Sequence, residues 1–393
     1  MSNDTQPEIR FPGFTEDWEQ RELSDISTKV QTKNKDREFT ETLTNSAEFG
    51  IISQNDFFDK EISNKNNIDG YYVVKPNDFV YNPRISNFAP VGPIKRNKLG
   101  RTGVMSPLYY VFSTNNIDNQ YLETYFSTSY WHKFMKLNGD SGARADRFAI
   151  RDSVFVKMPI PYPSREEQEK IGQFFEVLSN AIDLQQRKLD LLKEMKKGFL
   201  QKMFPKNGAK VPEIRFPGFT EDWEERRLQE VVDRYDNLRI PITASKRVAG
   251  NTPYYGANGI QGYVEGYTHD GEFILVAEDG ANDLKNYPVQ YVDGKVWVNN
   301  HAHVIQAKEN LADNMFLMNA IRSINIEPFL VGGGRAKLNA DVLMKLEVII
   351  PLKSEQQKIG NFFKQLDDTI TLHQRKLDLL KEMKKGFLQK MFV

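Results

Sequence analysis

The sequence contains no cysteine among its 393 residues. Disulfide bonds, cysteine-ligated zinc, iron–sulfur clusters and thiol nucleophiles are therefore excluded, and a reducing compartment is expected. Long apolar runs are also missing, because no stretch approaches the roughly 18 apolar residues that a membrane span needs. The opening segment has no signal-peptide pattern. We therefore expect a cytoplasmic protein that does not associate with a membrane.

Net charge is absent too, since 53 basic residues balance 53 acidic ones. No field of the whole molecule draws it onto nucleic acid, so any such binding must come from local patches. The 26 Phe and 16 Tyr are enough for hydrophobic cores. The length predicts two to four domains, at about 100–200 residues each.

Two signatures of enzyme chemistry are missing. No G-x-x-x-x-G-K-[ST] phosphate loop occurs, and the turn Gly332-Gly333-Gly334-Arg335 is not followed by Lys and Ser or Thr. The Asn/Asp-Pro-Pro-Tyr/Phe motif of amino-methyltransferases is represented only by Asn82-Pro83-Arg84. ATP binding by a phosphate loop and methyl transfer by this chain alone are therefore not expected.

Two internal repeats organise the chain. An entry motif at 7–23 recurs at 212–228 with 15 of 17 residues identical, and 186–204 recurs without a difference at 374–392. The segments between these repeats differ in composition and local motif. The sequence is therefore a tandem duplication. The repeated parts, 7–23 with 186–204 and 212–228 with 374–392, form a common frame, and the segments between them are variable.

Each repeat unit ends in a long helix with apolar residues in alternating steps of four and three. The proposed seams are Ile171, Phe175, Leu178, Ile182, Gln185, Leu189 and Leu192, and Ile359, Phe363, Leu366, Ile370, His373, Leu377 and Leu380. Capping boxes are predicted at Ser164 with Glu167 and at Ser354 with Gln357. A helix over 165–204 would be about 60 Å long. Matched seams favour an antiparallel coiled coil within the chain, and two independent helices are the alternative.

The fold class predicted is α+β, with two mixed α/β domains in tandem and two long helices. Strands are expected at 71–81, 108–112, 273–277, 295–300 and 346–351, and shorter helices at 117–135 and 312–324. The expected domains are a first variable domain at 1–162, a central helix at 163–204, a second variable domain at 205–350 and a C-terminal helix at 351–393.

Two patterns could indicate metal chemistry. Asp279 followed by Asp293-Gly294-Lys295 is similar to the carboxylate–lysine pattern of Mg²⁺-dependent nucleases, although Asp-Gly before a strand is also a common hairpin turn. His301 and His303 share a face if they lie in a strand, as metal ligands do, but no third ligand is evident. We expect neither a metal nor a catalytic residue in this chain.

Local patches suggest where a nucleic acid would bind. The segment 93–103 is basic and contains no acid, and each variable segment ends in a Gly-x-Arg-Ala turn. Arg reads guanine, while Asn and Gln read adenine. Basic loops can equally be solvated surface, and Asn a turn former. The candidate DNA contacts are Lys95, Arg96, Lys98, Arg101, Ser141, Arg144, Arg147, Tyr254, Tyr255, Asn258, Asn299, Asn300, His301, His303, Arg335 and Lys337.

The frame resembles the specificity subunit of type I restriction-modification systems. The resemblance lies in FPGFTEDWE at Phe11 and Phe216, in P-x-x-x-E-Q-x-K-I at Pro163 and Pro351, and in the helix ending LLKEMKKGFLQKMF. The second variable domain adds three motifs of a common target-recognition type: Tyr254-Tyr255-Gly256-Ala257-Asn258-Gly259, Ala277-Glu278-Asp279-Gly280 and Asn299-Asn300-His301-Ala302-His303.

The resemblance implies two target-recognition domains, each reading half of a bipartite site in double-stranded DNA, and a helical pair that sets the spacing. It also implies two methyltransferase subunits and two restriction/translocase subunits as partners. These partners would carry S-adenosylmethionine, ATP and Mg²⁺, while this chain binds no cofactor. A coiled-coil scaffold without DNA specificity and a self-sufficient nuclease are the alternatives.

Overall fold

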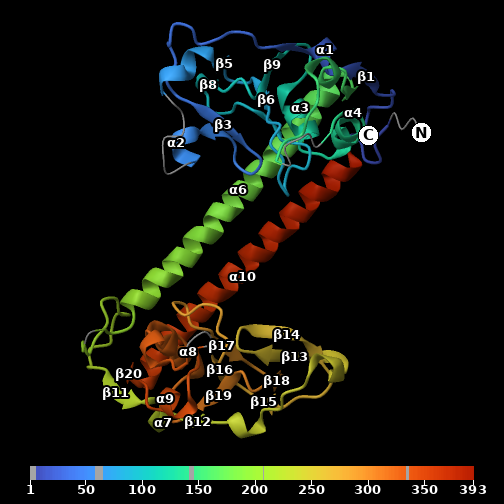
Figure 1. Ribbon diagram of the computed structural model, residues 1–393. Helices are drawn as coiled ribbons and strands as arrows, with labels where there is room; N and C mark the ends of the chain where they lie inside the picture. The colour runs from blue at the N-terminus through green and yellow to red at the C-terminus, as the bar shows by residue number, and fades with distance from the viewer. Residues whose placement is uncertain (1–5, 58–64, 141–145, 207, 333–335) are drawn as a thin grey trace. The chain divides into compact units, whose positions relative to one another are not determined.

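The computed structural model describes residues 6–57, 65–140, 146–206, 208–332 and 336–393. The chain forms two compact units, one of residues up to 185 together with 377–393, and one of residues 186–376 (Figure 1). Each unit contains one variable domain and a part of both long helices. The sequence-derived boundaries follow chain order, whereas the observed units divide each helix between them.

The first unit is built around a four-stranded antiparallel sheet. Its strands, in spatial order, are β2 (Ser27–Lys29), β9 (Tyr110–Thr114), β6 (Phe79–Tyr81) and β7 (Ile94–Arg96). Smaller antiparallel pairs are β1 (Glu19–Glu22) with β10 (Pro159–Tyr162), β3 (Leu43–Ser46) with β4 (Gly50–Ser53), and β5 (Tyr72–Val74) with β8 (Gly103–Met105). Short helical turns are α1 (Leu23–Ile26), α2 (Gln54–Phe57), η1 (Lys65–Gly70) and α5 (Asp152–Phe155).

The second unit repeats this sheet in the same order. Its strands are β12 (Val232–Arg234), β19 (Ala302–Ala307), β16 (Phe273–Ala277) and β17 (Val289–Val292). A second sheet has the order β14 (Gly259–Val264), β13 (Ala249–Gly256), β18 (Lys295–Val298) and β15 (His269–Asp270), in which β13 and β18 are parallel. β11 (Glu224–Arg227) pairs with β20 (Glu347–Ile350) as β1 does with β10. Short turns are α7 (Leu228–Val231), η2 (Asp236–Leu238), η3 (Ala244–Lys246), η4 (Glu327–Phe329) and α9 (Ala340–Met344).

Both faces of the central sheet are covered in each unit. In β16, Ile274 and Val276 pack with α8 (Asn314–Ser323), while Phe273 and Leu275 face the second sheet. All five residues of β16 are therefore buried, which explains the unbroken apolar run FILVA. In the first unit the equivalent helix is α3 (Asn119–Phe126).

The expected helix over 117–135 is two helices, α3 and α4 (Tyr130–Asn138). The break falls at Ser127-Thr128-Ser129, which the apolar pattern does not reveal. The Ser127 hydroxyl donates to the carbonyl oxygen of Thr124 at 2.6 Å, and the Thr128 hydroxyl to that of Tyr125 at 2.7 Å. Such local side-chain bonds compete with the helix, and here they end it.

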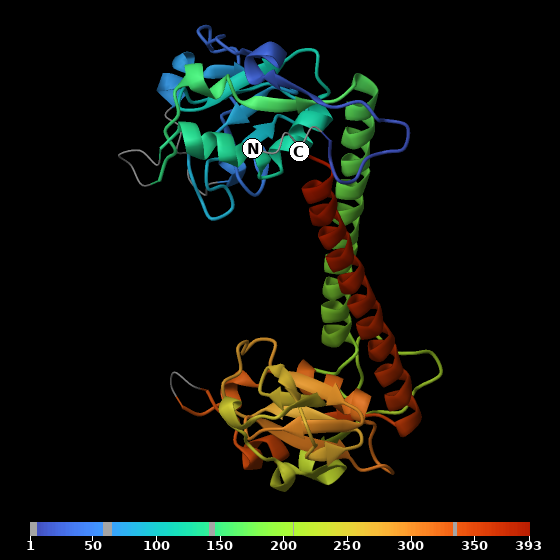
Figure 2. The ribbon, with the colours of Figure 1, turned by 90° about the vertical axis from the view of Figure 1, so that its right-hand side faces the viewer.

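The long helices are α6 (Arg165–Lys202) and α10 (Lys353–Lys390), each of 38 residues. The two helices lie side by side and antiparallel in each unit (Figure 2). In the first unit the rings of Phe174 and Phe387 meet at 5.1 Å, and in the second those of Phe199 and Phe362 at 5.0 Å. The expected antiparallel pairing is therefore present within each unit. All fourteen proposed seam residues are buried or half-buried.

The predicted capping boxes are only partly correct. The Ser164 hydroxyl accepts from the backbone N–H of Glu167 at 3.3 Å, but the Glu167 side chain turns into the domain instead of back to the cap. In the second repeat α10 already begins at Lys353, so Ser354 lies inside the helix and Leu352 takes the cap position. No helix in the described part of the chain has the length and apolar character needed to cross a membrane.

Candidate functional site

A buried carboxylate ties the first variable domain to α6. Glu167 is fully buried and receives two hydrogen bonds from the Arg10 guanidinium, at 2.7 and 2.8 Å, and one from the Trp18 indole at 3.1 Å. Hydrogen-bonded carboxylate–guanidinium pairs of this bidentate kind are strong and directional. The entry motif thus fixes the start of the helix, which explains why the motif and the Glu-Gln pair recur together.

The second unit repeats the arrangement. Arg215 donates two bonds to Glu355, both 2.8 Å long. The glutamine that follows each glutamate also makes the same bonds in both units. Gln356 accepts from the backbone N–H of Asp313 at 3.0 Å and donates to the carbonyl oxygen of Pro351 at 2.9 Å. In the first unit Gln168 makes the same two bonds, to Asp118 and Pro163, at 2.9 Å each. The Glu-Gln motif therefore joins strand, helix and variable domain.

The end of each long helix, identical in the two repeats, enters the core of the unit that holds the start of the other helix. The ring of Phe392 lies 5.6 Å from Tyr121 and 6.1 Å from Phe175 in the first unit. In the second, Phe204 lies 5.5 Å from Phe316. This accounts for the identity of the KMF ending in both repeats.

The variable surface of the first unit includes a groove of about 650 Å³. Two arginines line it, Arg84 and Arg147, and the rim carries two exposed apolar side chains, Phe88 at 81% and Leu108 at 59% exposure. Buried Asn45 supports its floor by donating to the carbonyl oxygen of Val80 at 2.7 Å. Of the sequence candidates that the structure describes, only Arg147 lies here. Arg84 is not among the sequence candidates. It belongs to Asn82-Pro83-Arg84, which the sequence compares only with a methyltransferase motif.

The basic loop at 93–103 is not a free patch of positive charge. Arg96 is mostly buried and bonds Glu123 at 2.6 Å, and Lys98 lies 3.5 Å from the same carboxylate. Arg101 makes two bonds of 2.7 Å to Glu41. The acids come from distant parts of the chain, so the local sequence concealed them. Arg96 and Arg101 therefore form internal ion pairs, and the contacts with DNA that the sequence predicts for this loop stay predictions.

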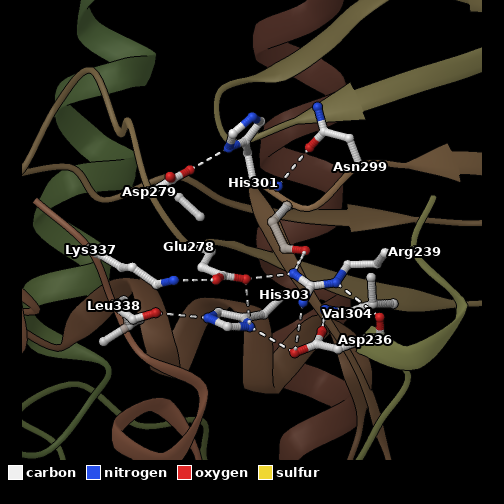
Figure 3. A network of polar contacts seen from close by, with 12 residues as sticks. Asp236, Arg239, Glu278, Asp279, Asn299, His301, His303, Val304, Lys337 and Leu338 are labelled. Carbon is white, nitrogen blue, oxygen red and sulfur yellow. Dashed lines mark hydrogen bonds and ion pairs between the residues drawn. The ribbon is translucent and has the colours of Figure 1, made fainter. Parts of the chain in front are cut away.

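The variable surface of the second unit contains a polar network (Figure 3). Buried His303 lies at its centre, with Nδ1 2.8 Å from Asp236 and Nε2 2.8 Å from the carbonyl oxygen of Leu338. Glu278 accepts from Arg239 at 2.7 Å and lies 2.9 Å from the Lys337 ammonium. The network holds the loops that follow β16 and precede α9 against β19.

The network stabilises its carboxylates in the ionised form. Burial alone would raise the pKa of Asp236, but the hydrogen bonds from His303 and from the backbone of Val304 outweigh it, so that this pKa lies below its usual range. The pKa of Glu278 is also lowered, because Lys337 and Arg239 outweigh the effect of burial. Sequence reasoning missed Asp236 and Arg239, which no motif distinguishes.

Several sequence candidates in this unit have structural roles. Tyr254 is buried, with its hydroxyl 3.3 Å from the backbone of Ile242. Asn299 is buried and accepts from the backbone N–H of His301 at 2.8 Å. Asn258 is exposed, but its amide bridges Gly280 and Asn282 at 2.9 and 3.0 Å. Tyr254, Asn299 and His303 are thus buried within the unit, whereas Asn258 is exposed and its predicted contact with DNA stays a prediction.

The remaining candidates lie at or near the surface. Asn300 is exposed, while Tyr255, His301 and Lys95 are half-buried, and the side chain of Lys337 is 44% exposed. His301 Nδ1 contacts the Asp279 carboxylate. Ser141, Arg144 and Arg335 lie outside the described residues, so the roles expected for the two Gly-x-Arg-Ala turns stay predictions.

The proposed nuclease pattern does not assemble. Asp279 lies two residues after β16, whereas Asp293 follows the last residue of the antiparallel β17, whose Val292 pairs with Phe273 at the other end of β16. The five residues of β16 together with Glu278 separate the two ends, which is about 20 Å at roughly 3.3 Å per residue. One metal ion cannot bridge them. Both ring nitrogens of His303 already have partners, and no cluster of three potential ligands occurs among the described residues.

Comparisons with known proteins agree with this architecture. A family described as type I restriction modification DNA specificity domain matches the chain twice, over residues 15–194 and 220–382. A solved S subunit of a type I restriction-modification system from M. genitalium has a similar fold, with a TM-score of 0.67 over 99% of both chains at 14% identity.

Curated relatives bear related names. The putative type I restriction enzyme specificity subunit S.HindORF215P of Haemophilus influenzae is 47% identical over 154 residues, which are 39% of this chain and 39% of that protein. The type I restriction enzyme MjaVIII specificity subunit of Methanocaldococcus jannaschii is 22% identical over 74% of this chain and 73% of its own length. Since the family matches fall on the two repeats and together span most of the sequence, the chain belongs to the type I restriction-modification DNA specificity family.

Proposed function

We propose that this chain determines the DNA sequence on which a type I restriction-modification complex acts, with each variable domain reading one half of a bipartite target. One observation carries the proposal: the central ion pair of the frame is repeated, as in Arg10–Glu167 and Arg215–Glu355, while the variable surfaces differ. A DNA target with two different halves requires two variable domains that differ from each other on a frame that is the same for both.

The two surfaces offer different chemistry for base and backbone contacts. In the first unit, Arg84 and Arg147 are suited to guanine or phosphate, and Phe88 and Leu108 to apolar contact with a thymine methyl group. In the second, the exposed amide of Asn300 is suited to adenine. The Asp236–His303 network would act behind this surface by fixing the loops, without touching DNA.

The frame is proposed to dock two copies of one partner, the methyltransferase subunit, and through them two restriction/translocase subunits. S-adenosylmethionine, ATP and Mg²⁺ would be bound by those partners, and this chain would contribute no catalytic residue. The helices would set the spacer: 38 residues measure about 57 Å, which exceeds the roughly 34 Å of one turn of B-DNA. Such a complex acts on DNA in the cytoplasm.

The test measures affinity for the duplex whose adenines the assembled complex methylates, and for a scrambled duplex, at two salt concentrations. We expect Arg147→Ala to cost about 1–3 kcal/mol on the cognate duplex only, if it reads a base. A phosphate contact would instead weaken both duplexes and reduce the salt slope by about one. Arg144→Ala and Arg335→Ala test the two glycine-rich turns in the same way.

Asp279→Ala serves as the control against catalysis by this chain. It should leave methylation by the assembled complex largely intact, because Asp279 and Asp293 lie at opposite ends of β16 and cannot hold one metal ion together. Loss of all cleavage with binding retained would revive the nuclease hypothesis. Equal affinity of the assembled complex for cognate and scrambled DNA would instead leave the scaffold hypothesis.

A further inference from the structure

A groove of about 640 Å³ in the first unit lies between the start of α4 and the last turns of α10. Three lysines of α10 and one histidine of α4 line it: Lys381, Lys384, Lys385 and His132. Hydroxyl groups of the break between α3 and α4 complete the wall, among them Ser127 and Ser129. Among the described residues that line this groove, none is acidic.

The duplication provides an internal reference for this groove. Lys384 and Lys196 are equivalent in the identical repeat, and both are half-buried. Lys196 contacts the carboxylate of Asp367 on α10, and Arg322 lies 3.7 Å from the same carboxylate. The residue of α6 equivalent to Asp367 is Ser179, and Lys384 donates to its hydroxyl at 2.8 Å. The first unit therefore has the same lysine with a neutral partner in place of the carboxylate.

The acidic groups nearby compensate only in part for the missing carboxylate. Glu123 is engaged by Arg96 at 2.6 Å and lies 3.5 Å from Lys98. Asp183 is exposed and does not line the groove. Burial is the largest effect on the pKa of Lys384, and the opposing effects of Asp183 and Glu123 still leave this pKa below its ordinary value. A half-buried ammonium without an ion-pair partner is costly, so a bound anion would stabilise it.

We propose that this groove binds a phosphate group, held by Lys384, Lys385 and Lys381 across from the first turn of α4. The lysines supply ammonium donors, and the Ser129 hydroxyl, which makes no capping bond to its own helix, supplies a neutral donor. The positive end of the α4 dipole adds to the attraction. The phosphate belongs either to a DNA backbone or to a small phosphate ligand.

The test uses the full chain and titrates inorganic pyrophosphate, followed by calorimetry and by the midpoint of thermal unfolding. Lys385→Gln removes an exposed ammonium from the groove, and Lys197→Gln removes its exact sequence equivalent in the second unit. We expect Lys385→Gln to weaken pyrophosphate binding about tenfold, since a charge-assisted hydrogen bond is lost. Lys197→Gln should bind like the wild type.

Ser179→Asp is the decisive variant, because it restores at Lys384 the pair that Lys196 makes with Asp367. It should abolish pyrophosphate binding without lowering the unfolding midpoint in phosphate-free buffer. Equal pyrophosphate binding by wild type, Lys385→Gln and Ser179→Asp would overturn the proposal, and so would absence of binding by the wild type to both pyrophosphate and duplex DNA.

A second arm with a scrambled DNA duplex identifies the source of the phosphate. A reduction of the salt slope by about one in Lys385→Gln, but not in Lys197→Gln, assigns the groove to the DNA backbone. An unchanged slope together with weaker pyrophosphate binding assigns it to a small ligand. The scrambled duplex keeps this result separate from target reading, whose failure would appear only as equal affinity for cognate and scrambled DNA.

Discussion

Glu167 and Glu355 show what one buried side chain can do in a duplicated protein. Each is almost inaccessible to solvent, and each is satisfied by an arginine of the entry motif. A lone buried carboxylate would be expensive, so the motif and the Glu-Gln pair cannot vary separately. The sequence showed both motifs as repeats, but not that they meet, because more than a hundred residues separate them along the chain.

Replacing Arg10 tests this dependence. Arg10→Met should destabilise the protein by about 3–5 kcal/mol, because Glu167 would remain buried without its ionic partner. Denaturant unfolding followed by circular dichroism measures the change. Arg226→Met is the matched control, since Arg226 and Glu224 form an exposed pair worth at most about 1 kcal/mol. Similar losses in both variants would contradict the role assigned to Glu167.

Acid should weaken the second unit through Asp236 and Glu278. Both carboxyl groups have a folded-state pKa below their ordinary values of 3.8 and 4.5. Their contribution to stability is therefore complete above those ordinary values and is lost as the pH falls through the lowered ones. Thermal unfolding between about pH 3 and 7 should show this loss in the wild type and a flatter profile in Asp236→Asn. Parallel profiles for the two proteins would refute the assignment.

At the scale of elements, periodicity predicts the long helices well and their surroundings poorly. The steps of four and three identify α6 and α10, and the burial of Leu189 and Leu377 follows from them. The predicted N-cap of α10, Ser354, lies two residues after the observed one, Leu352, although serine is the residue type that favours this position. The break between α3 and α4 depends on hydroxyl–carbonyl bonds that an apolar pattern does not encode.

Two glycines of α10 should respond oppositely to alanine. A Cβ added at Gly360 would lie 2.8 Å from Asp313 Oδ1, which caps α8, and 3.1 Å from the backbone nitrogen of Phe316. Gly360→Ala should therefore cost about 1–3 kcal/mol. A Cβ at Gly386 meets nothing within 4 Å, so Gly386→Ala should gain up to about 1 kcal/mol of helix propensity. The unfolding midpoints of the two variants test this difference. A similar decrease in midpoint for both variants would contradict the close packing at Gly360.

The polar residues of the two seams should lower the stability of the helix pair and fix the register of its helices. Gln185 is buried and His373 half-buried, each within an otherwise apolar stripe. Replacing both by Leu should raise the melting temperature or permit other helix pairings, as polar seam residues do in coiled coils. Calorimetry and sedimentation measure the two effects. An unchanged protein by both methods would mean that the heptad assignment is shifted.

At the scale of the whole molecule, the duplication, the fold class and the family resemblance follow from sequence, whereas the side-chain chemistry of the variable domains does not. Arg96 and Arg101 looked like free cations because their partners Glu123 and Glu41 lie elsewhere in the chain. Tyr254 and His303 looked like contact residues because polar and aromatic types occur equally in cores and at surfaces. Long-range packing decides between these roles, and local patterns do not contain it.

The modular frame leads to a prediction about exchange of a whole domain. Replacing residues 29–162 by the matching segment of a relative should change one half of the DNA target and leave the other half unchanged. Arg10, Trp18 and Glu167 lie outside the exchanged segment and are kept. Gln168, which is also kept, accepts a hydrogen bond of 2.9 Å from the backbone N–H of Asp118 in the exchanged segment. Because that bond uses the backbone, it tolerates a different sequence on the incoming domain.

The donor must nevertheless bring an aromatic residue at the position of Tyr121, whose ring packs 6.3 Å from Trp18 and 5.6 Å from Phe392. A donor with a small residue there should lose stability by about 3–5 kcal/mol, as a large-to-small change in a core does. Mapping methylated adenines after assembly with the methyltransferase subunit reads out the new target. A change in both halves of the target, in a chimaera as stable as the parent, would show that the two domains do not read DNA independently.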